Sequence, residues 1–429
     1  MKSRHPLILI CCLFVLSARA VLMAADEPAE APFNYVRGKA YHILPRTHNN
    51  QSGYFSICEG KNGKIYVGTA KYDENAFLVE FDPETEKQRV VIDTNDVCGL
   101  EATGYAAQAK IHTRNYVGTS GKIYVGSKQG YRSEGDTSEY PGGYVMTYDP
   151  ETDSAECLGM PYPGQGVIDV VADEKRGLLY VVTCEEQHWM VGDIKGESYR
   201  ELGPILAPYA TTLVDRKGRA NAITVGHQLA QYEPGTDRII IRDIVIDGEK
   251  LVPKGRYGIP IWRLSPDGRK AYLIFLSDPR LIEVKLMSGG AKVKAIRHAP
   301  MVEGQRPDSR SGLDVAPDGR VYALVRVRNT TGFGGGNLHH LARYDPKNDK
   351  IEDLGVLAVR NPDFFDFGEK LGDRKPPWTH GYHRLPDGTL TPLHAHQGLI
   401  VAGDGTVYAT ILYPFTLLRI PPGQLVGNN

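Results

Sequence analysis

The chain has no excess of charge of either sign and few cysteines, and both absences exclude classes of function. Its 50 Lys and Arg are balanced by 51 Asp and Glu, which leaves a formal net charge of −1. Proteins that bind DNA or RNA need a basic field for the phosphates, so we expect no nucleic-acid partner. Only six cysteines occur in 429 residues. None of them has the CxxC spacing of a zinc or redox motif.

Long apolar runs are also missing, except near the N-terminus, where residues 1–25 are predicted to be a secretory signal. A basic start (residues 1–4) precedes an apolar run (7–16) and a small-residue cleavage site. A lipid anchor on Cys11 is the alternative interpretation. Nothing later in the chain approaches the roughly 18 consecutive apolar residues that a membrane helix requires. The sequence therefore predicts a secreted or periplasmic protein that is not transmembrane.

Four cysteines follow the predicted signal: Cys58, Cys98, Cys157 and Cys184. In an exported chain they can form two disulfides in any of three pairings. We expect them to have a structural role or none.

A short motif recurs along the chain, in which a turn containing glycine is followed by an alternating strand. The clearest copies are Asn62–Gly68 and Ser120–Gly126. A glycine after Asn or Asp between two apolar runs is typical of a β-hairpin, because glycine tolerates positive φ. The seven turn glycines are Gly63, Gly121, Gly177, Gly218, Gly268, Gly319 and Gly405.

A second motif, typified by Tyr-Asp-Pro-Glu-Thr, follows most of the hairpins. Its copies are Phe81–Thr85, Tyr148–Thr152, Tyr232–Thr236 and Tyr344–Asn348. Proline presets the backbone of a turn, so this motif predicts the hairpin between the third and fourth strands of each repeat. Seven repeats of four strands, spaced by roughly 40 to 60 residues, favour an all-β, seven-bladed β-propeller. The alternative is six or eight blades.

The propeller is predicted to be a single domain over residues 26–429. Its last repeat lacks an outermost strand, which residues 40–44 can supply. Such closure removes an exposed sheet edge. Residues 357–392 form a long insertion that we expect near the mouth of the central axis.

Alignment on the turn glycines predicts which side chains meet at the axis. The residues nine positions before these glycines are Tyr54, His112, Ile168, Tyr209, Ile259, Arg310 and His396. Five of the seven can transfer protons or hold a negative charge, which predicts a functional site.

Loops that leave the second strands are expected on the same face, and they add cations and aromatic rings. They contribute Lys71, Lys128, Tyr131, Arg132, His188, His227, Arg326, Arg328 and Tyr413. Glu185 and Glu186 are the main opposing charges. An acidic saccharide such as a uronate suits this surface. The alternative is that these are ordinary solvated loop residues.

These residue types predict β-elimination next to a uronate carboxylate. The reaction needs a base, a cation that neutralises the carboxylate, and an acid for the leaving oxygen. His112 or His396 is the predicted base, Arg310 the neutralising cation, and Tyr54 or Tyr209 the acid. No pair of hydrolytic carboxylates and no nucleophile elbow competes with this interpretation.

A divalent cation is a further possibility. His394 and His396 are two residues apart and share one side of a strand, Gln397 follows them, and His112 is able to approach from another blade. Such a set is compatible with Mn²⁺, Zn²⁺ or Ca²⁺. We expect no organic cofactor.

The Gly-Lys-Ile-Tyr-Val-Gly and Tyr-Asp-Pro-Glu-Thr elements resemble exported bacterial propellers of the gluconolactonase and streptogramin-lyase-like superfamily. The axial set also resembles propeller polysaccharide lyases of the oligogalacturonate type. That resemblance implies a divalent cation held by histidines and a glutamine, here His394, His396, Gln397 and His112. The acidic metal ligands of a gluconolactonase are not apparent at the axial positions.

Three functions remain open. The favoured one is a lyase that acts on an acidic saccharide. The alternatives are a propeller that binds saccharide or protein without catalysis, and a metal-dependent hydrolase or lactonase. The protein is expected to be a monomer.

Overall fold

The computed structural model describes residues 30–49, 51–253, 258–276, 278–302, 312–367, 378–379, 381–393 and 398–426. Within these residues the protein is all-β, as predicted, and its only α-helix is α1 (Thr94–Cys98). Short 3-10 turns occur at Pro45–Thr47, Gly104–Ala106 and Pro422–Gln424. No helix in these ranges is long and apolar enough to cross a lipid bilayer.

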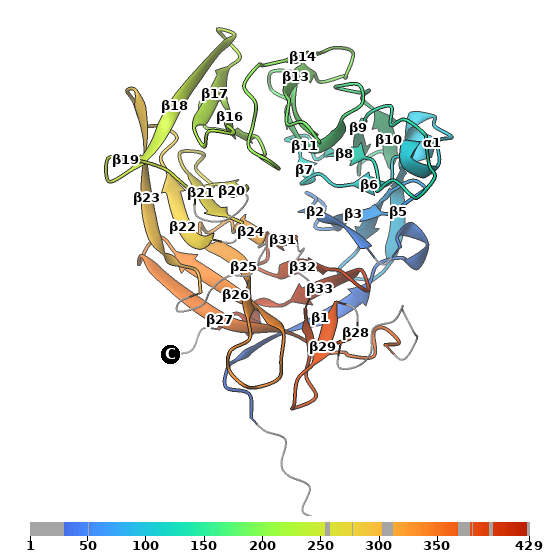
Figure 1. Cartoon of the computed structure of the whole chain (residues 1–429), viewed down its shortest axis with the longest axis vertical. Helices are drawn as coiled ribbons and strands as arrows, with labels where there is room; N and C mark the ends of the chain where they lie inside the picture. Colours follow the sequence, from blue (N-terminus) through green and yellow to red (C-terminus); the bar gives the residue numbers. More distant parts are fainter. Residues whose placement is uncertain are drawn as a thin grey trace, which may run out of the picture.

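Most strands pair antiparallel with the next strand in the chain, so the sheets are meanders that follow one another around an axis (Figure 1). The first group is β2 (Gln51–Glu59), β3 (Ile65–Ala70), β4 (Phe77–Phe81) and β5 (Gln88–Asp93). The next is β6 (Lys110–Ile111), β7 (Tyr116–Val117), β8 (Ile123–Lys128), β9 (Val145–Asp149) and β10 (Ser154–Cys157). It is followed by β11 (Gly166–Asp173), β12 (Leu178–Cys184), β13 (Trp189–Asp193) and β14 (Tyr199–Glu201).

The remaining sheets continue the same pattern. One holds β15 (Leu213–Val214), β16 (Ala220–Ile223), β17 (Leu229–Glu233) and β18 (Arg238–Ile246), with β19 (Glu249–Lys250) on its edge. The next holds β20 (Pro260–Leu264), β21 (Ala271–Phe275), β22 (Asp278–Val284) and β23 (Lys292–Pro300). Then come β24 (Gly312–Val315), β25 (Val321–Arg328), β26 (Asn337–Asp345) and β27 (Lys350–Val359), and finally β31 (Leu399–Val401), β32 (Val407–Ile411) and β33 (Thr416–Ile420).

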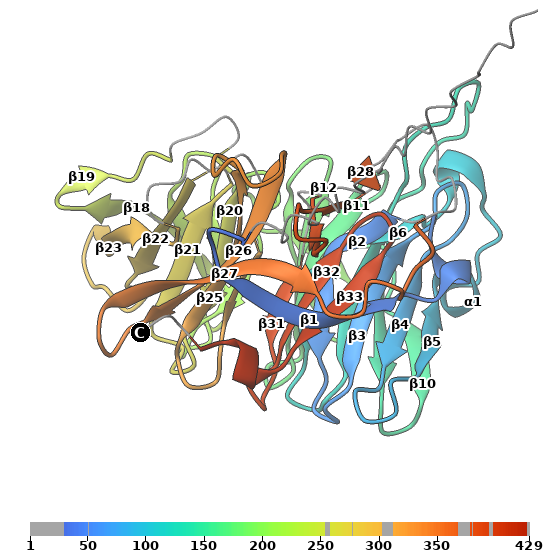
Figure 2. The ribbon, with the colours of Figure 1, turned by 90° about the horizontal axis from the view of Figure 1, so that it is seen from below.

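The N-terminal strand β1 (Tyr35–His42) joins the two ends of the chain. Its second half pairs antiparallel with β33, and its first half pairs parallel with β27. Residues 40–44 were expected to add a strand here, and the strand in the structure spans Tyr35–His42. Figure 2 shows β1 and β27 side by side across this part of the molecule.

The turn glycines lie where the sequence predicts hairpins. All seven have positive φ. Six stand between the first two strands of their group, and Gly121 stands between β7 and β8. The proline turns join later strands, for example β4 to β5 and β9 to β10, and a residue of positive φ such as Glu86 or Asp153 completes each turn. Both motifs therefore report local backbone geometry correctly.

The segment predicted as an insertion, 357–392, begins inside a strand, because β27 extends to Val359. Beyond it, β28 (Trp378–Thr379), β29 (Tyr382–Arg384) and β30 (Leu390–Pro392) form a small antiparallel sheet. This sheet packs against β26 and β27, where Tyr382 and Leu390 join the apolar core.

Two features of the fold position the site. Inner strands such as β8 and β21 are buried on both faces, whereas outer strands such as β10 alternate between exposed and partly exposed residues. In addition, the two-residue strand β6 pairs with both β3 and β8 and so connects two meanders. Residues at or just beyond the ends of the inner strands of several meanders consequently line one cavity.

Candidate functional site

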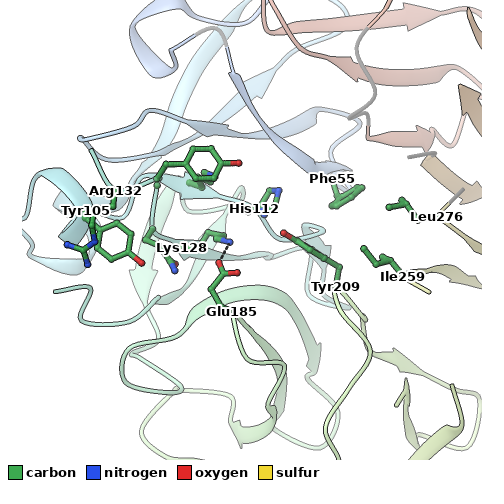
Figure 3. A pocket seen from close by; sticks show the side chains of 13 residues that line it. Phe55, Tyr105, His112, Lys128, Arg132, Glu185, Tyr209, Ile259 and Leu276 are labelled. Carbon is green, nitrogen blue, oxygen red and sulfur yellow. Dashed lines mark hydrogen bonds and ion pairs between the residues drawn. The ribbon is translucent and has the colours of Figure 1, made fainter. Parts of the chain in front are cut away.

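One cavity of about 560 Å³ opens where several meanders meet, and its polar lining is mostly cationic and aromatic (Figure 3). Its lining residues are Phe55, Tyr105, Lys110, His112, Lys128, Gln129, Gly130, Tyr131, Arg132, Glu185, Tyr209, Ile259 and Leu276. They come from five consecutive strand groups, from β2 to β21 and its following loop. Three of the residues that stand nine positions before a turn glycine are among them: His112, Tyr209 and Ile259.

Two predicted axial residues, His112 and Tyr209, lie side by side in this cavity. Their ring centroids are 6.1 Å apart in an edge-to-face arrangement. The ring centroid of Phe55, on β2, lies 6.0 Å from that of His112. The hydroxyl end of Tyr209 is directed toward His112 and Lys128 (Figure 3). His112 is buried, whereas Tyr209 is partly exposed to the cavity. An imidazole and a phenol thus line the same cavity.

Lys128, at the end of β8, is a buried cation held by two neighbours. Its Nζ lies 3.0 Å from Glu185 Oε1 and 3.3 Å from Cys184 Sγ. Burial acts to lower the pKa of Lys128, but the Cys184 sulfur and the Glu185 carboxylate outweigh it and raise this pKa above its usual value. Lys128 therefore stays positively charged at neutral pH.

Lys110 lies opposite Lys128 in the β6–β8 pair, so two lysines are cross-strand neighbours. Burial, and then the charge of Lys128, lower the pKa of Lys110 to about 7. Its Nζ also lies 4.2 Å from the ring centroid of Tyr131 and 4.7 Å from that of Tyr72, contacts that favour the ammonium form. Near neutral pH this amine is therefore close to the balance between its two protonation states.

The outer part of the cavity is formed by the loop after β8. The guanidinium of Arg132 stacks 3.9 Å from the ring centroid of Tyr105 and donates hydrogen bonds to the carbonyls of Asp136 and Ser138. Gln129, deeper in the cavity, is 4 % exposed, and its Oε1 has no hydrogen-bond partner within the part of the chain that the structure describes. This oxygen is itself buried.

Two arginine–aspartate pairs lie next to the cavity. A smaller hollow of about 40 Å³ is lined by Arg114, Arg263, Phe55 and Tyr209, among others. Arg114 Nη2 lies 3.6 Å from Asp169 Oδ1, and Arg263 Nε lies 3.4 Å from Asp314 Oδ1.

The two carboxylates of these pairs also accept hydrogen bonds from the backbone. Asp169 accepts a hydrogen bond from the Thr212 N–H at 2.7 Å, and Asp314 accepts one from the Val401 N–H at 2.8 Å. Burial raises the pKa of Asp169 to about 6, although Arg114 opposes this. Within the described residues, no group of three or more His, Cys, Asp and Glu is arranged to hold a metal ion.

The predicted site residues fall into four sets. His112, Tyr209, Lys128, Tyr131 and Arg132 line the cavity, as do Ile259 and the opposing Glu185. Ile168 lines the smaller hollow, and Tyr54 stands on β2 directly before Phe55. A third set lies outside the described residues, as does the predicted signal (residues 1–25). This set is Arg310, His394, His396 and Gln397.

The remaining predicted residues are not among those that line the cavity. His188 stacks on Tyr162 with centroids 4.2 Å apart, and its ring nitrogens contact Glu201 and Glu186. His227 contacts the Gly258 carbonyl at 3.0 Å.

Four more of these residues are placed by their own surroundings. Lys71 pairs with Glu74, and Arg326 donates to the Leu393 carbonyl at 3.3 Å. Arg328 ends β25 and is exposed, and Tyr413 has a φ of 56° before a cis proline.

Sequence reasoning missed Lys110, Gln129, Phe55 and Tyr105. Lys110 had a usable signal, because it stands two residues before His112 and alternation along a strand directs both to the same side. Gln129 directly follows Lys128, so it belongs to a loop that was already singled out. Tyr105 had no such signal, since it lies in a 3-10 turn far from any repeat motif.

No family model matches the sequence, and no curated protein does. Among solved structures, the β-propeller domain of Cps50 (Swd1) from Myceliophteria thermophila is similar, with a TM-score of 0.50 and 12% sequence identity. The match covers 90% of this chain and 99% of that one. At this identity the likeness concerns architecture alone. Together with the meandering sheets around one axis, it shows that the chain is a β-propeller.

Proposed function

We propose that this protein is an exported, seven-bladed β-propeller that binds an acidic saccharide in the cavity around His112 and Tyr209 and cleaves it by β-elimination. The blade count is supported by seven successive meanders, the last of which gains its fourth strand from β1. This closure places the first and last strands of the chain in one sheet.

The observation that carries the proposal is the composition of the cavity. Three cationic side chains, those of Lys110, Lys128 and Arg132, face the same space as four aromatic rings, against the single carboxylate of Glu185. Cations attract a carboxylate or sulfate, and aromatic faces pack against the apolar face of a sugar ring. A neutral sugar would leave the two buried lysines without a counter-charge from the ligand.

His112 and Tyr209 supply the proton transfers that β-elimination needs. A ring nitrogen of His112 removes the proton from the carbon next to the carboxylate. The electron pair of that C–H bond forms the new double bond as the bond to the leaving oxygen breaks. The Tyr209 hydroxyl donates its proton to that oxygen. Afterwards His112 releases its proton to solvent and Tyr209 takes one up from solvent, which restores both residues. No water is consumed in this reaction.

The two lysines stabilise the negative charge that develops on the carboxylate during proton removal. Lys128 is suited to this role because Cys184 and Glu185 keep it protonated. Lys110 lies directly across from it, so a carboxylate between them interacts with both amines.

A divalent cation remains a proposal that concerns mainly His394, His396 and Gln397, which lie outside the described residues. His112, the fourth predicted ligand, has no cluster of His, Cys, Asp or Glu around it in the part of the chain that is described. The proposed reaction therefore uses only side chains of the protein. The axial carboxylates Asp169 and Asp314 are paired with arginines, which disfavours a lactonase with acidic metal ligands.

The test is a screen of acidic polysaccharides and oligosaccharides, followed by the ultraviolet absorbance of an unsaturated uronate, with and without chelator. We expect product with the wild type, and a loss of kcat of about 10²–10⁴-fold in His112→Ala and in Tyr209→Phe. His298→Gln is the matched control, because His298 lies on the outer strand β23 beside Tyr344, away from the cavity. Saccharide binding by the wild type without any unsaturated product, and unchanged in both variants, would instead assign a non-catalytic, saccharide-binding propeller.

A further inference from the structure

Two of the four cysteines lie together at the outer edge of the molecule, away from the cavity. Cys98 is the last residue of α1, and Cys157 is the last residue of β10. α1 packs against β10, although 59 positions separate the two cysteines (157 − 98) (Figure 1). Both residues are partly exposed, and no disulfide joins them in this structure.

The two thiols are in contact with each other. Cys98 interacts with Cys157 as a hydrogen-bond partner, and this contact raises the pKa of Cys98 while it lowers that of Cys157. The Gly159 backbone N–H adds to the stabilisation of the Cys157 thiolate. The remaining cysteines are apart from this pair, since Cys58 is buried on β2 and Cys184 contacts Lys128.

The elements that carry the two cysteines are held in place. Asp93 caps the N-terminus of α1 by accepting hydrogen bonds from the N–H groups of Asn95 and Asp96, and Gly99 ends the helix with a φ of 63°. On the other side, Cys157 pairs with Met146 in the β9–β10 ladder. The two sulfur atoms are therefore neighbours because of fixed backbone, which is what a disulfide requires.

Cys157 is also accessible to a small oxidant. It lines a surface groove of about 610 Å³ together with Val97, the residue before Cys98. Lys122, Lys195 and Glu156 line the same groove, so its charged side chains are two cations and one carboxylate, which favours anionic molecules. A thiolate beside lysines in an open groove is the kind of cysteine that reacts with disulfides.

We propose that Cys98 and Cys157 form a disulfide that links α1 to β10, and that a small anionic disulfide such as oxidised glutathione is its oxidant. The Cys157 thiolate attacks this disulfide, forms a mixed disulfide and releases one thiolate of the oxidant. Cys98 loses its proton to solvent and attacks the Cys157 sulfur, which releases the second thiolate. Two protein thiols are thereby oxidised, and one small disulfide is reduced to two thiols.

The bond should stabilise the fold, because it closes a long loop in the unfolded chain. Oxidation is expected to raise the Tm by roughly 5 °C relative to the reduced protein. The cavity around His112 is lined by other residues, so this inference does not depend on the proposed function.

Trypsin separates all four cysteines and makes the test direct. Cys98 falls in the peptide of residues 90–110 and Cys157 in that of residues 133–175, whereas Cys58 and Cys184 fall in 47–61 and 177–195. The purified full-length protein is incubated with oxidised or reduced glutathione, its free thiols are alkylated, and the digest is analysed by mass spectrometry. We expect a cross-link between residues 90–110 and 133–175 in the oxidised sample, which a reductant removes.

Recovery of both peptides in alkylated form after oxidation, or their linkage to the Cys58 or Cys184 peptide, would overturn the inference. The variants Cys98→Ser and Cys157→Ser should each abolish the redox-dependent change in Tm. Cys58→Ala is the matched control, because it removes a buried thiol and should leave the cross-link intact.

Discussion

At the residue scale, Lys110 is the most informative side chain of the cavity. A lysine with a pKa near neutrality loses its charge within the range in which most enzymes are assayed. An anion bound next to it favours the ammonium form. Above pH 7, ligand binding is therefore expected to be accompanied by the uptake of a proton from solution. We therefore expect ligand binding in this cavity to depend on pH.

We predict that the affinity for an anionic saccharide is highest below pH 7 and decreases above it, by up to about tenfold per pH unit. Lys110→Arg keeps a cation at all these pH values and should abolish the decrease. Lys128→Arg should retain it, because Lys128 is already charged throughout this range. Isothermal titration calorimetry between pH 6 and pH 9, in buffers of different ionisation enthalpy, measures both the affinity and the proton uptake. An affinity that is equally pH-dependent in Lys110→Arg would assign the titration to another group.

The same lysine should reduce the stability of the fold. Because the pKa of Lys110 is about 7 when folded and near its ordinary value when unfolded, the unfolded chain binds more protons between these limits, and stability rises with pH across that window. Below pH 7 the destabilisation is complete. Lys110→Met should therefore raise the Tm at pH 6 by several degrees and have a smaller effect at pH 10, as measured by differential scanning calorimetry. A lower Tm at pH 6 would indicate that the contacts with Tyr72 and Tyr131 dominate instead.

At the element scale, the turn glycines hold the hairpins in register. Gly319, between β24 and β25, has a φ of 90°, and among the described residues no atom beyond its chain neighbours lies within 4 Å of where a β-carbon would stand. Any cost of a side chain there is consequently backbone strain alone. Gly235, in the proline turn between β17 and β18, is equally open but does not have positive φ.

This pair of glycines makes a controlled prediction. Gly319→Ala should destabilise the protein by about 1 kcal/mol, whereas Gly235→Ala should be neutral or slightly stabilising because it only restricts the unfolded chain. Urea unfolding of the two variants and the wild type compares the free energies. Equal effects at both positions would mean that positive φ does not determine the choice of glycine in these turns.

The whole molecule shows which levels of structure the sequence predicts well. The turn glycines and proline motifs predicted hairpins, an all-β chain and a propeller, because tight turns depend on local backbone preferences. Counting back from the glycines brought His112 and Tyr209 into one cavity, since equivalent positions of successive meanders face the axis. The cross-strand pairing of Lys110 with Lys128 was not predictable, because β6 has no hairpin motif of its own and pairs with two meanders at once.

Side chains in irregular loops were predicted least well. His188 and His227 follow second strands like Lys128 does, yet their rings contact neighbouring groups of the protein instead of lining the cavity. Loop length and local hydrogen bonds decide such orientations, and neither is visible in a repeat motif. The sequence also gave no reason to choose among the three cysteine pairings, because the proximity of α1 and β10 is a property of the assembled sheets.

The central claim is that the cavity of His112, Tyr209 and the paired lysines is where an acidic saccharide binds. The most direct measurement is a crystal structure of the Tyr209→Phe variant with a uronate oligosaccharide that the wild type binds. We expect a carboxylate of the ligand within hydrogen-bonding distance of Lys110 and Lys128, with its neighbouring carbon facing His112. A ligand bound elsewhere on the propeller, with this cavity filled only by water, would contradict the account.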